Sequence, residues 1–144
     1  MRDIIAAGLA ELGLTGRVPG DSPALLAEYG RLLLEKKQVM NLTAITQPDQ
    51  VARLHMLDCA ALLPCADLTG ARTLLDVGTG AGFPGLPLKI LLPQLDVTLL
   101  DSLNKRVDWL NEVSAQLGLT GVRAIQGRAE EKALEKSMRD SFDL

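Results

Sequence analysis

A glycine-dense segment near the middle of the chain has the residue types of a ligand-binding loop. Residues 76–85 read DVGTGAGFPG and directly follow the apolar run 73–75. Three glycines at alternate positions, Gly78, Gly80 and Gly82, allow the backbone to adopt positive φ and to approach a bound group closely. A helix that begins after such a loop presents unpaired N–H donors and the positive end of its dipole. The segment therefore predicts a binding turn between a buried strand and a helix.

The next strand-like segment supplies a second signal. Residues 97–100 read VTLL and end in Asp101, where a doubly wound sheet places the acid that binds ribose hydroxyls. With 13 glycines in 144 residues, an alternating glycine pattern also arises in ordinary loops, so the loop alone is weak evidence. A strand before the loop, a helix after it and an acid closing the following strand together favour a cofactor that contains ribose.

The acid at the start of the loop bears on which cofactor binds. A dinucleotide lays its pyrophosphate on a helix N-terminus, and Asp76 would lie unfavourably close to that phosphate. S-adenosylmethionine has no phosphate, and a carboxylate would stabilise its ammonium and sulfonium groups. The even glycine spacing also departs from the GxGxxG pattern of dinucleotide sites. We therefore expect an S-adenosylmethionine site, and a nicotinamide enzyme is the competing class.

Five segments carry a resemblance that extends over nearly the whole chain from about residue 36. They are residues 41–43 (NLT), 55–58 (HMLD), 76–85, 99–107 (LLDSLNKRV) and 128–131 (RAEE). In their order and spacing they resemble the bacterial small-subunit ribosomal RNA guanine-N7 methyltransferase G family, also called glucose-inhibited division protein B. The resemblance implies transfer of a methyl group from S-adenosylmethionine to N7 of a guanosine in the 530 loop of 16S ribosomal RNA.

The resemblance also implies which residues contact the cofactor: Gly78, Phe83, Ala129 and Glu130. We expect the three loop glycines to hold the methionine part, and Phe83 to pack against it or against the adenosine. Asp101 should accept hydrogen bonds from the ribose hydroxyls. Ala129 and Glu130 follow the third predicted strand and should border the adenine.

The chemistry explains why no catalytic residue is assigned. Guanine N7 has a lone pair and no proton, so its methylation needs alignment of nucleophile, methyl and sulfur rather than a general base. His55 and Asp58, three residues apart on one predicted helix, have the types of a catalytic pair. Such residues more often form structural hydrogen bonds, and we expect them to tie the N-terminal helices to the core.

Charge limits how RNA could bind. A net charge of −3 and a pI near 5.1 argue against RNA binding over the whole surface, because phosphate affinity comes from lysine and arginine. We assign Lys105, Arg106 and Arg128 as candidate RNA contacts, each of which could instead be a solvated surface charge. Two widely spaced cysteines and a single histidine lead us to predict no metal site.

The location of the protein follows from what its sequence lacks. Charged residues interrupt every apolar run before the ~18 residues that a membrane-spanning helix requires. The first residues do not show the pattern of a signal peptide. We therefore expect a cytoplasmic protein that has no contact with a membrane, with 16S ribosomal RNA or the small ribosomal subunit as its partner.

Hydrophobic periodicity divides the chain into two parts. Residues 1–72 form an N-terminal helical segment, with helices predicted at 3–12, 22–37 and 46–63. Residues 73–144 form a Rossmann-like core with parallel strands at 73–77, 97–100 and 122–125. Helices on both sheet faces are expected at 84–92 and from a Ser102 cap to about Leu117, with Gly118 as the stop. The fold class is α/β, implied by the resemblance to be the class I S-adenosylmethionine-dependent methyltransferase fold with an incomplete parallel sheet.

The last residues suggest a shortened form. Residues 142–144 (FDL) resemble the start of a fourth strand, whereas the family continues with further strands and a Ser-Arg-Ala segment. The fourth strand of this fold pairs with the first, so we expect strand 73–77 to be an open, self-associating edge. We interpret the chain as a C-terminally truncated family member. The alternative to an active enzyme is an inactive remnant that still binds cofactor or RNA.

Overall fold

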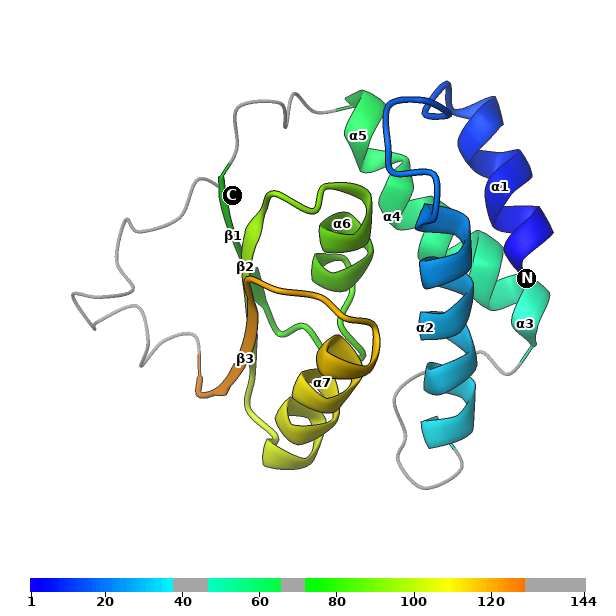
Figure 1. Cartoon of the computed structure of the whole chain (residues 1–144). Coiled ribbons are helices and arrows are strands. Elements are labelled where there is room, and N and C mark those ends of the chain that lie inside the picture. Colours follow the sequence, from blue (N-terminus) through cyan, green and yellow to red (C-terminus); the bar gives the residue numbers. More distant parts are fainter. Residues whose placement is uncertain (38–46, 66–71, 129–144) are drawn as a thin grey trace.

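The computed structural model describes residues 1–37, 47–65 and 72–128 (Figure 1). Some sequence expectations fall outside these ranges: the segment 41–43, the adenine contacts Ala129 and Glu130, and the start of a fourth strand at 142–144. The described residues comprise the helical first part of the chain and the first three strands of the sheet.

Three parallel strands form the sheet in the order in which they occur along the chain. They are β1 (Thr73–Val77), β2 (Asp96–Asp101) and β3 (Val122–Gln126), with β2 in the centre. The sequence predicted each strand to within one residue at either end. The register pairs Val77 with Leu100 and Asp101 with Gln126, so the carboxyl ends of the strands lie side by side. Within the described residues β1 pairs only with β2, as expected for an edge strand.

Two crossover helices, α6 (Gly85–Leu91) and α7 (Asn104–Gln116), join the strands and lie on the same face of the sheet (Figure 1). Both connections run in the same direction across the sheet, and a right-handed crossover then places both helices on one side. The expectation of helices on both faces is therefore wrong for the part of the chain that the structure describes.

The crossover helices bury apolar side chains against the sheet. Helix α7 buries Val107, Leu110 and Val113, which recur every three residues and so share one helix face. All residues of the shorter α6 are buried, including Lys89. The Lys89 ammonium group donates hydrogen bonds to the carbonyl of Pro93 at 2.5 Å and to that of Leu95. These bonds satisfy a buried charge with carbonyls that follow the end of α6.

The two ends of α7 differ in how well the sequence predicted them. Gly118 ends the helix in the left-handed conformation, with φ of +70°, as expected. The expected Ser102 cap is wrong, because the helix starts at Asn104 and its N-cap is Leu103. The carboxylate of Asp101 instead accepts the Leu103 N–H at 3.0 Å. Helix α7 thus has no side-chain cap at its start, and Asp101 orders the turn that precedes it.

The N-terminal helical segment begins as the sequence predicted and then departs from it. Helices α1 (Arg2–Glu11) and α2 (Ser22–Lys37) match the expected ranges closely. The single helix expected at 46–63 is instead divided into α3 (Pro48–Gln50), the π-helical η1 (Val51–Leu57), α4 (Asp58–Ala60) and, after a turn, α5 (Leu62–Cys65). Over seven residues, the apolar spacing of a π-helix is too similar to that of an α-helix for sequence to separate them.

Tyr29 of α2 connects the helical segment to the glycine loop. Its side chain is fully buried, and its hydroxyl donates a hydrogen bond to the Ala81 carbonyl within the loop. Its ring stacks on Phe83 at a centroid distance of 5.5 Å and meets Trp109 of α7 edge-on at 6.4 Å. One side chain therefore contacts both the loop and a crossover helix.

Residues on both sides of the predicted boundary at 72/73 belong to one hydrophobic core. Ile5 and Leu33 from the helical segment lie in the same buried cluster as Leu74, Leu99 and Leu110. The division into a helical segment and a sheet core thus describes secondary structure, whereas the packing is continuous.

None of the described helices has the length and apolarity that crossing a bilayer requires.

The burial of Tyr29 predicts how the protein responds to alkali. Burial holds the pKa of this hydroxyl well above the usual range of tyrosine, and Cys59 and Asp76 raise it further. Because the pKa is higher in the folded state, the stabilisation is complete below about pH 10 and is lost as pH rises above that value. Tyr29 is the only tyrosine in the chain, so tyrosinate absorbance reports on it alone. We expect tyrosinate to appear only together with loss of the circular dichroism of the folded state; titration near pH 10 in a folded protein would contradict this.

Candidate cofactor-binding site

The glycine loop folds back over the carboxyl ends of β1 and β2. Its three glycines have φ values of +67° at Gly78, +59° at Gly80 and +101° at Gly82. Thr79 anchors the loop, because its N–H donates to the Leu100 carbonyl at 3.0 Å and its carbonyl accepts the Gly82 N–H at 2.9 Å. The predicted positive φ values are thus present, and they bring the loop backbone next to the end of β2.

The glycines differ in what surrounds them. A Cβ atom at Gly78 or Gly80 would meet no other atom within 4 Å. A Cβ atom at Gly82 would lie 2.4 Å from the Tyr29 hydroxyl oxygen and 2.9 Å from a Leu86 methyl carbon. The first two glycines therefore border open space, where a ligand has room to approach the backbone, whereas Gly82 packs closely against the helical segment.

Asp101 ends β2 with a buried carboxylate that several groups hold in place. Its side chain is 4% exposed. Oδ2 accepts the Gly80 N–H at 2.9 Å, and Oδ1 accepts the Leu103 N–H at 3.0 Å. The guanidinium Nη1 of Arg106 lies 3.6 Å from Oδ1. The carboxylate is thus bonded both to the glycine loop and to the turn that starts α7.

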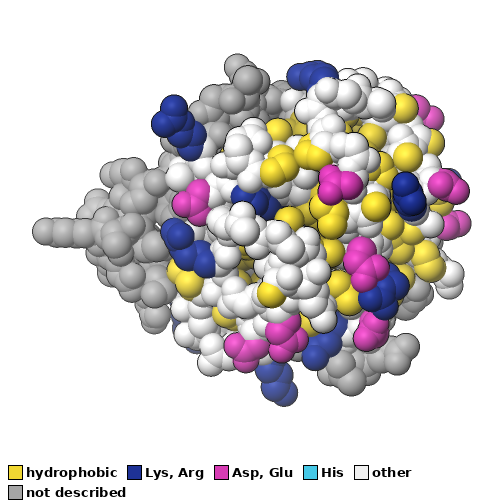
Figure 2. Space-filling model, viewed as in Figure 1, with side chains coloured by type: hydrophobic (Ala, Val, Ile, Leu, Met, Phe, Trp, Pro, Cys, Tyr) yellow, Lys and Arg dark blue, Asp and Glu magenta, His cyan; other side chains and the backbone are white. Residues whose placement is uncertain are grey.

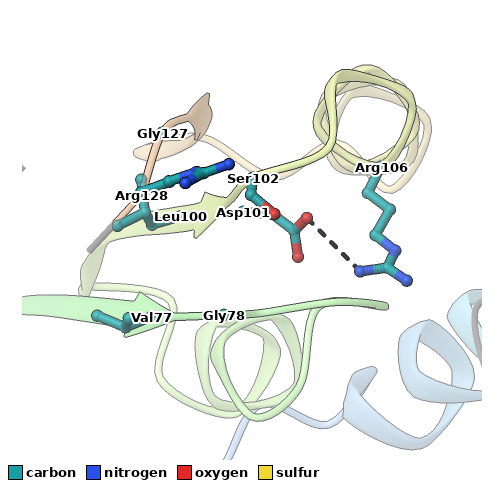
Figure 3. Close-up of a pocket in the computed structure, with 8 residues that line it drawn as sticks. All are labelled: Val77, Gly78, Leu100, Asp101, Ser102, Arg106, Gly127 and Arg128. Atoms are coloured by element: carbon teal, nitrogen blue, oxygen red, sulfur yellow. Dashed lines mark ion pairs between the residues drawn. The ribbon is translucent and has the colours of Figure 1, made fainter. Parts of the chain in front are cut away.

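A cavity of about 480 Å³ opens at the carboxyl ends of the three strands (Figure 3). Its volume is in the range usual for small-molecule sites. Two of the predicted cofactor residues, Gly78 and Asp101, line it, and so do two of the predicted RNA contacts, Arg106 and Arg128. The described residues that line it are Val77, Gly78, Leu100, Asp101, Ser102, Arg106, Gly127 and Arg128. Lys105, the third predicted RNA contact, is exposed on α7 and is not part of the lining.

Asp76 lies beneath the loop rather than in the cavity. Its Oδ2 accepts hydrogen bonds from the Thr79 hydroxyl at 2.7 Å and from the Gly85 N–H at 3.0 Å. Burial raises the pKa of this carboxyl above its usual range, and the two hydrogen bonds partly oppose that shift. In this geometry the carboxylate bonds the loop to the start of α6, and the expected contact of Asp76 with a cationic ligand stays a prediction.

Phe83 also lies away from the cavity lining. Its ring is stacked between His55, at a centroid distance of 4.4 Å, and Tyr29, at 5.5 Å. Phe83 thus packs against the helical segment, and its expected contact with the cofactor stays a prediction. His55 is half-buried, and burial lowers its pKa while nearby Asp58 opposes the shift. The link that His55 was expected to make between helices and core consists at least partly of this ring stacking.

Sequence reasoning did not assign Val77 and Ser102 to the site, and it gave Arg106 only an RNA role. Val77 precedes Gly78 in the sequence and Ser102 follows Asp101, and this adjacency is the signal that could have identified them. Arg106 lies in the first turn of α7 and faces back toward Asp101. Within residues 1–37, 47–65 and 72–128, no three histidine, cysteine or acidic side chains gather as a metal site.

A parallel sheet with a glycine loop after its first strand and a buried acid ending its second is shared by Rossmann-like folds that bind a ribose-containing cofactor, the class I S-adenosylmethionine-dependent methyltransferases among them. The sequence matches the family model of rRNA small subunit methyltransferase G (GidB) over residues 23–144. The chain therefore belongs to this family, as the resemblance implied.

Curated relatives agree with this assignment. Proteins named ribosomal RNA small subunit methyltransferase G from Clostridium perfringens (strain 13 / Type A) and Alkaliphilus metalliredigens (strain QYMF) are 47% identical over 116 residues and 46% identical over 140 residues. The matches cover 81% and 97% of this chain, and 48% and 58% of the relatives. A protein of the same name from Myxococcus xanthus (strain DK1622) is 49% identical over 128 residues, which is 89% of this chain and 57% of the relative. The chain thus spans about half the length of these relatives.

The buried position of Asp76 predicts different effects for two substitutions. Asp76→Asn keeps an acceptor for Thr79 and Gly85 and removes a charge that burial disfavours. We expect its free energy of unfolding at pH 7 to lie within about 1 kcal/mol of the unsubstituted chain or above it. Asp76→Leu leaves both donors without a partner and should cost about 2–4 kcal/mol. Urea unfolding followed by circular dichroism measures both.

The pH dependence provides a second readout. Since the folded state raises the pKa of Asp76, the cost of its charge falls as pH is lowered through that raised value. The unsubstituted chain should therefore gain stability relative to Asp76→Asn as pH is lowered from 7 toward about 4, the ordinary pKa of aspartate. An Asp76→Asn variant as unstable as Asp76→Leu would show that the ionised carboxylate itself is required.

Proposed function

We propose that this chain binds S-adenosylmethionine in the cavity at the carboxyl ends of its strands. We further propose that its activity is transfer of the methyl group to N7 of a guanosine in the 530 loop of 16S ribosomal RNA. The observation that carries the proposal is the buried Asp101 carboxylate, which accepts a hydrogen bond from the Gly80 N–H and lies in the wall of the cavity. The chain also belongs to this family. The names of the relatives support ribosomal RNA as the substrate.

The residues of the cavity suit this ligand. Asp101 offers a carboxylate to the ribose hydroxyls, and hydrogen bonds to a charged acceptor are among the strongest that a neutral ligand can make. Gly78 and Gly80 leave open space in which the methionine part could contact the loop backbone. We propose Ala129 and Glu130, which follow Arg128, as the adenine contacts. Gly82, Phe83 and Asp76 then act indirectly, by holding the loop against the helical segment and α6.

The protein's part in the reaction is to bind and to align. The bound cofactor supplies an electrophilic methyl group on a sulfonium. Guanine N7 needs no base to remove a proton, so the chain must position the purine in line with the carbon–sulfur bond. Lys105, Arg106 and Arg128 are proposed to contact the RNA backbone beside the cavity. On the face shown in Figure 2, basic and acidic side chains are interspersed among the described residues, which favours such a local contact over a broad basic surface.

Calorimetric titration with S-adenosylhomocysteine tests the cofactor site. We expect saturable binding by the unsubstituted chain and binding about 10- to 100-fold weaker by Asp101→Asn, because charge-assisted hydrogen bonds to the ribose are lost. The matched control is Asp96→Asn, at the other end of β2, where the side chain is 52% exposed and outside the cavity. This control should bind like the unsubstituted chain.

Two further ligands separate the competing functions. Binding of NAD with an affinity equal to that of S-adenosylhomocysteine would favour the nicotinamide class and contradict the proposal. Transfer of labelled methyl from S-adenosylmethionine to small-subunit RNA that lacks this modification separates an enzyme from an inactive remnant. Binding without transfer would leave this chain as a cofactor-binding module.

We also propose a cytoplasmic location and self-association through β1. Within the described sheet, the outer edge of β1 pairs with no strand, and such edges present unpaired N–H and carbonyl groups. Sedimentation velocity should show a mass that increases with protein concentration. A single monomeric species at all concentrations would refute pairing through this edge.

A further inference from the structure

The ion pair between Asp101 and Arg106 lies in the wall of the cavity. Its two partners differ in environment, because the carboxylate is 4% exposed and the arginine side chain is 33% exposed. Figure 3 shows the guanidinium extending from α7 toward the carboxylate, with the ion pair drawn between them. A ligand that reaches Asp101 must therefore come close to Arg106.

The hydrogen bonds that the Asp101 carboxylate already accepts show where a ribose hydroxyl could bind. Each carboxylate oxygen can accept about two hydrogen bonds. Oδ2 already accepts the Gly80 N–H and Oδ1 the Leu103 N–H, so each oxygen has about one position left. Arg106 faces Oδ1 at 3.6 Å, which is longer than a hydrogen bond. Arg106 thus provides charge near Oδ1 without a short bond, and a hydroxyl at normal bonding distance can replace it there.

We propose that the ribose of the bound cofactor replaces Arg106 at Asp101, and that the released guanidinium binds a backbone phosphate of the RNA. This inference rests on the proposed function for both ligands. An arginine remains charged under all physiological conditions, and its planar fork suits a phosphate. Among the described residues that line the cavity, Asp101 is the only acid. Exposed Arg128 lies on the same rim and adds to the attraction for phosphate.

The consequence is coupling between two ligands. Cofactor binding makes one more cation available to RNA, and thermodynamic linkage then requires RNA to strengthen cofactor binding by the same factor. The Asp101–Arg106 pair would thus favour RNA binding to the cofactor-loaded protein.

A second ion pair provides a matched control. Arg123 of β3 pairs with Asp96, the first residue of β2, with Nη1 and Oδ1 3.7 Å apart. Both side chains are more than half exposed, and neither lines the cavity. Arg106→Gln and Arg123→Gln therefore make the same chemical change in ion pairs of similar length, and only the first pair involves the ribose-binding acid.

The test is titration of a labelled 530-loop RNA hairpin, followed by fluorescence anisotropy, with and without saturating S-adenosylhomocysteine. For the unsubstituted chain we expect the ligand to increase RNA affinity at least about fivefold, at the lower end of typical couplings. The dependence of log affinity on log salt should become steeper by about 0.7–0.9, the value of one added phosphate contact. Arg106→Gln should bind S-adenosylhomocysteine at least as tightly as the unsubstituted chain and should lose the coupling. Arg106→Lys should retain part of it, and Arg123→Gln should retain all of it.

Several outcomes would overturn the inference. RNA affinity that does not change with S-adenosylhomocysteine in the unsubstituted chain would do so, as would coupling that persists in Arg106→Gln. Weaker S-adenosylhomocysteine binding by Arg106→Gln would show instead that the arginine holds the carboxylate in place for the ligand. If the unsubstituted chain binds S-adenosylhomocysteine but does not bind the RNA, both this inference and the RNA part of the proposed function are refuted. Failure to bind S-adenosylhomocysteine would instead refute the cofactor site itself.

Discussion

The geometry of the cavity depends on the hydrogen bond from the Gly80 N–H to the carboxylate of Asp101. The bond joins the loop after β1 to the end of β2, two segments that parallel pairing has already brought side by side. A glycine with positive φ turns this amide toward the acid, whose carboxylate is buried while the glycine is half-buried. The same carboxylate orders the start of α7 through Leu103. One side chain therefore sets the position of the loop, the helix and the cavity wall.

Support for the loop comes from three directions. Asp76 holds it from below, Tyr29 bonds to it from α2, and His55 and Tyr29 enclose the Phe83 ring. The helical segment thus serves as part of the wall that shapes the binding loop, and its apolar residues share one core with the sheet. This explains how glycines, which favour disorder in isolation, adopt a defined backbone here.

Much of this arrangement could be predicted from the sequence because it depends on local signals. Apolar runs predicted the strands, the spacing of glycines predicted the loop, and Gly118 predicted the end of α7. The packing of the Phe83 ring could not be predicted, because side-chain direction in a loop depends on residues distant in sequence, here Tyr29 and His55. The hydrogen bonds that Asp76 accepts from the loop were likewise not predicted. The predicted Ser102 cap failed because the helix begins one residue later than that cap requires, with Leu103 as its N-cap and no side-chain cap. Helices were expected on both sheet faces because element order alone does not reveal strand order.

The edge-on contact between Trp109 and Tyr29 has a practical consequence. The chain contains one tryptophan and one tyrosine, and the structure brings the two together at the joint between the helical segment, the loop and α7. Indole emission is sensitive to the polarity and motion of its surroundings. The protein therefore carries a built-in optical reporter at the point where its loop is supported, so that movement of the loop can be followed without attaching a dye.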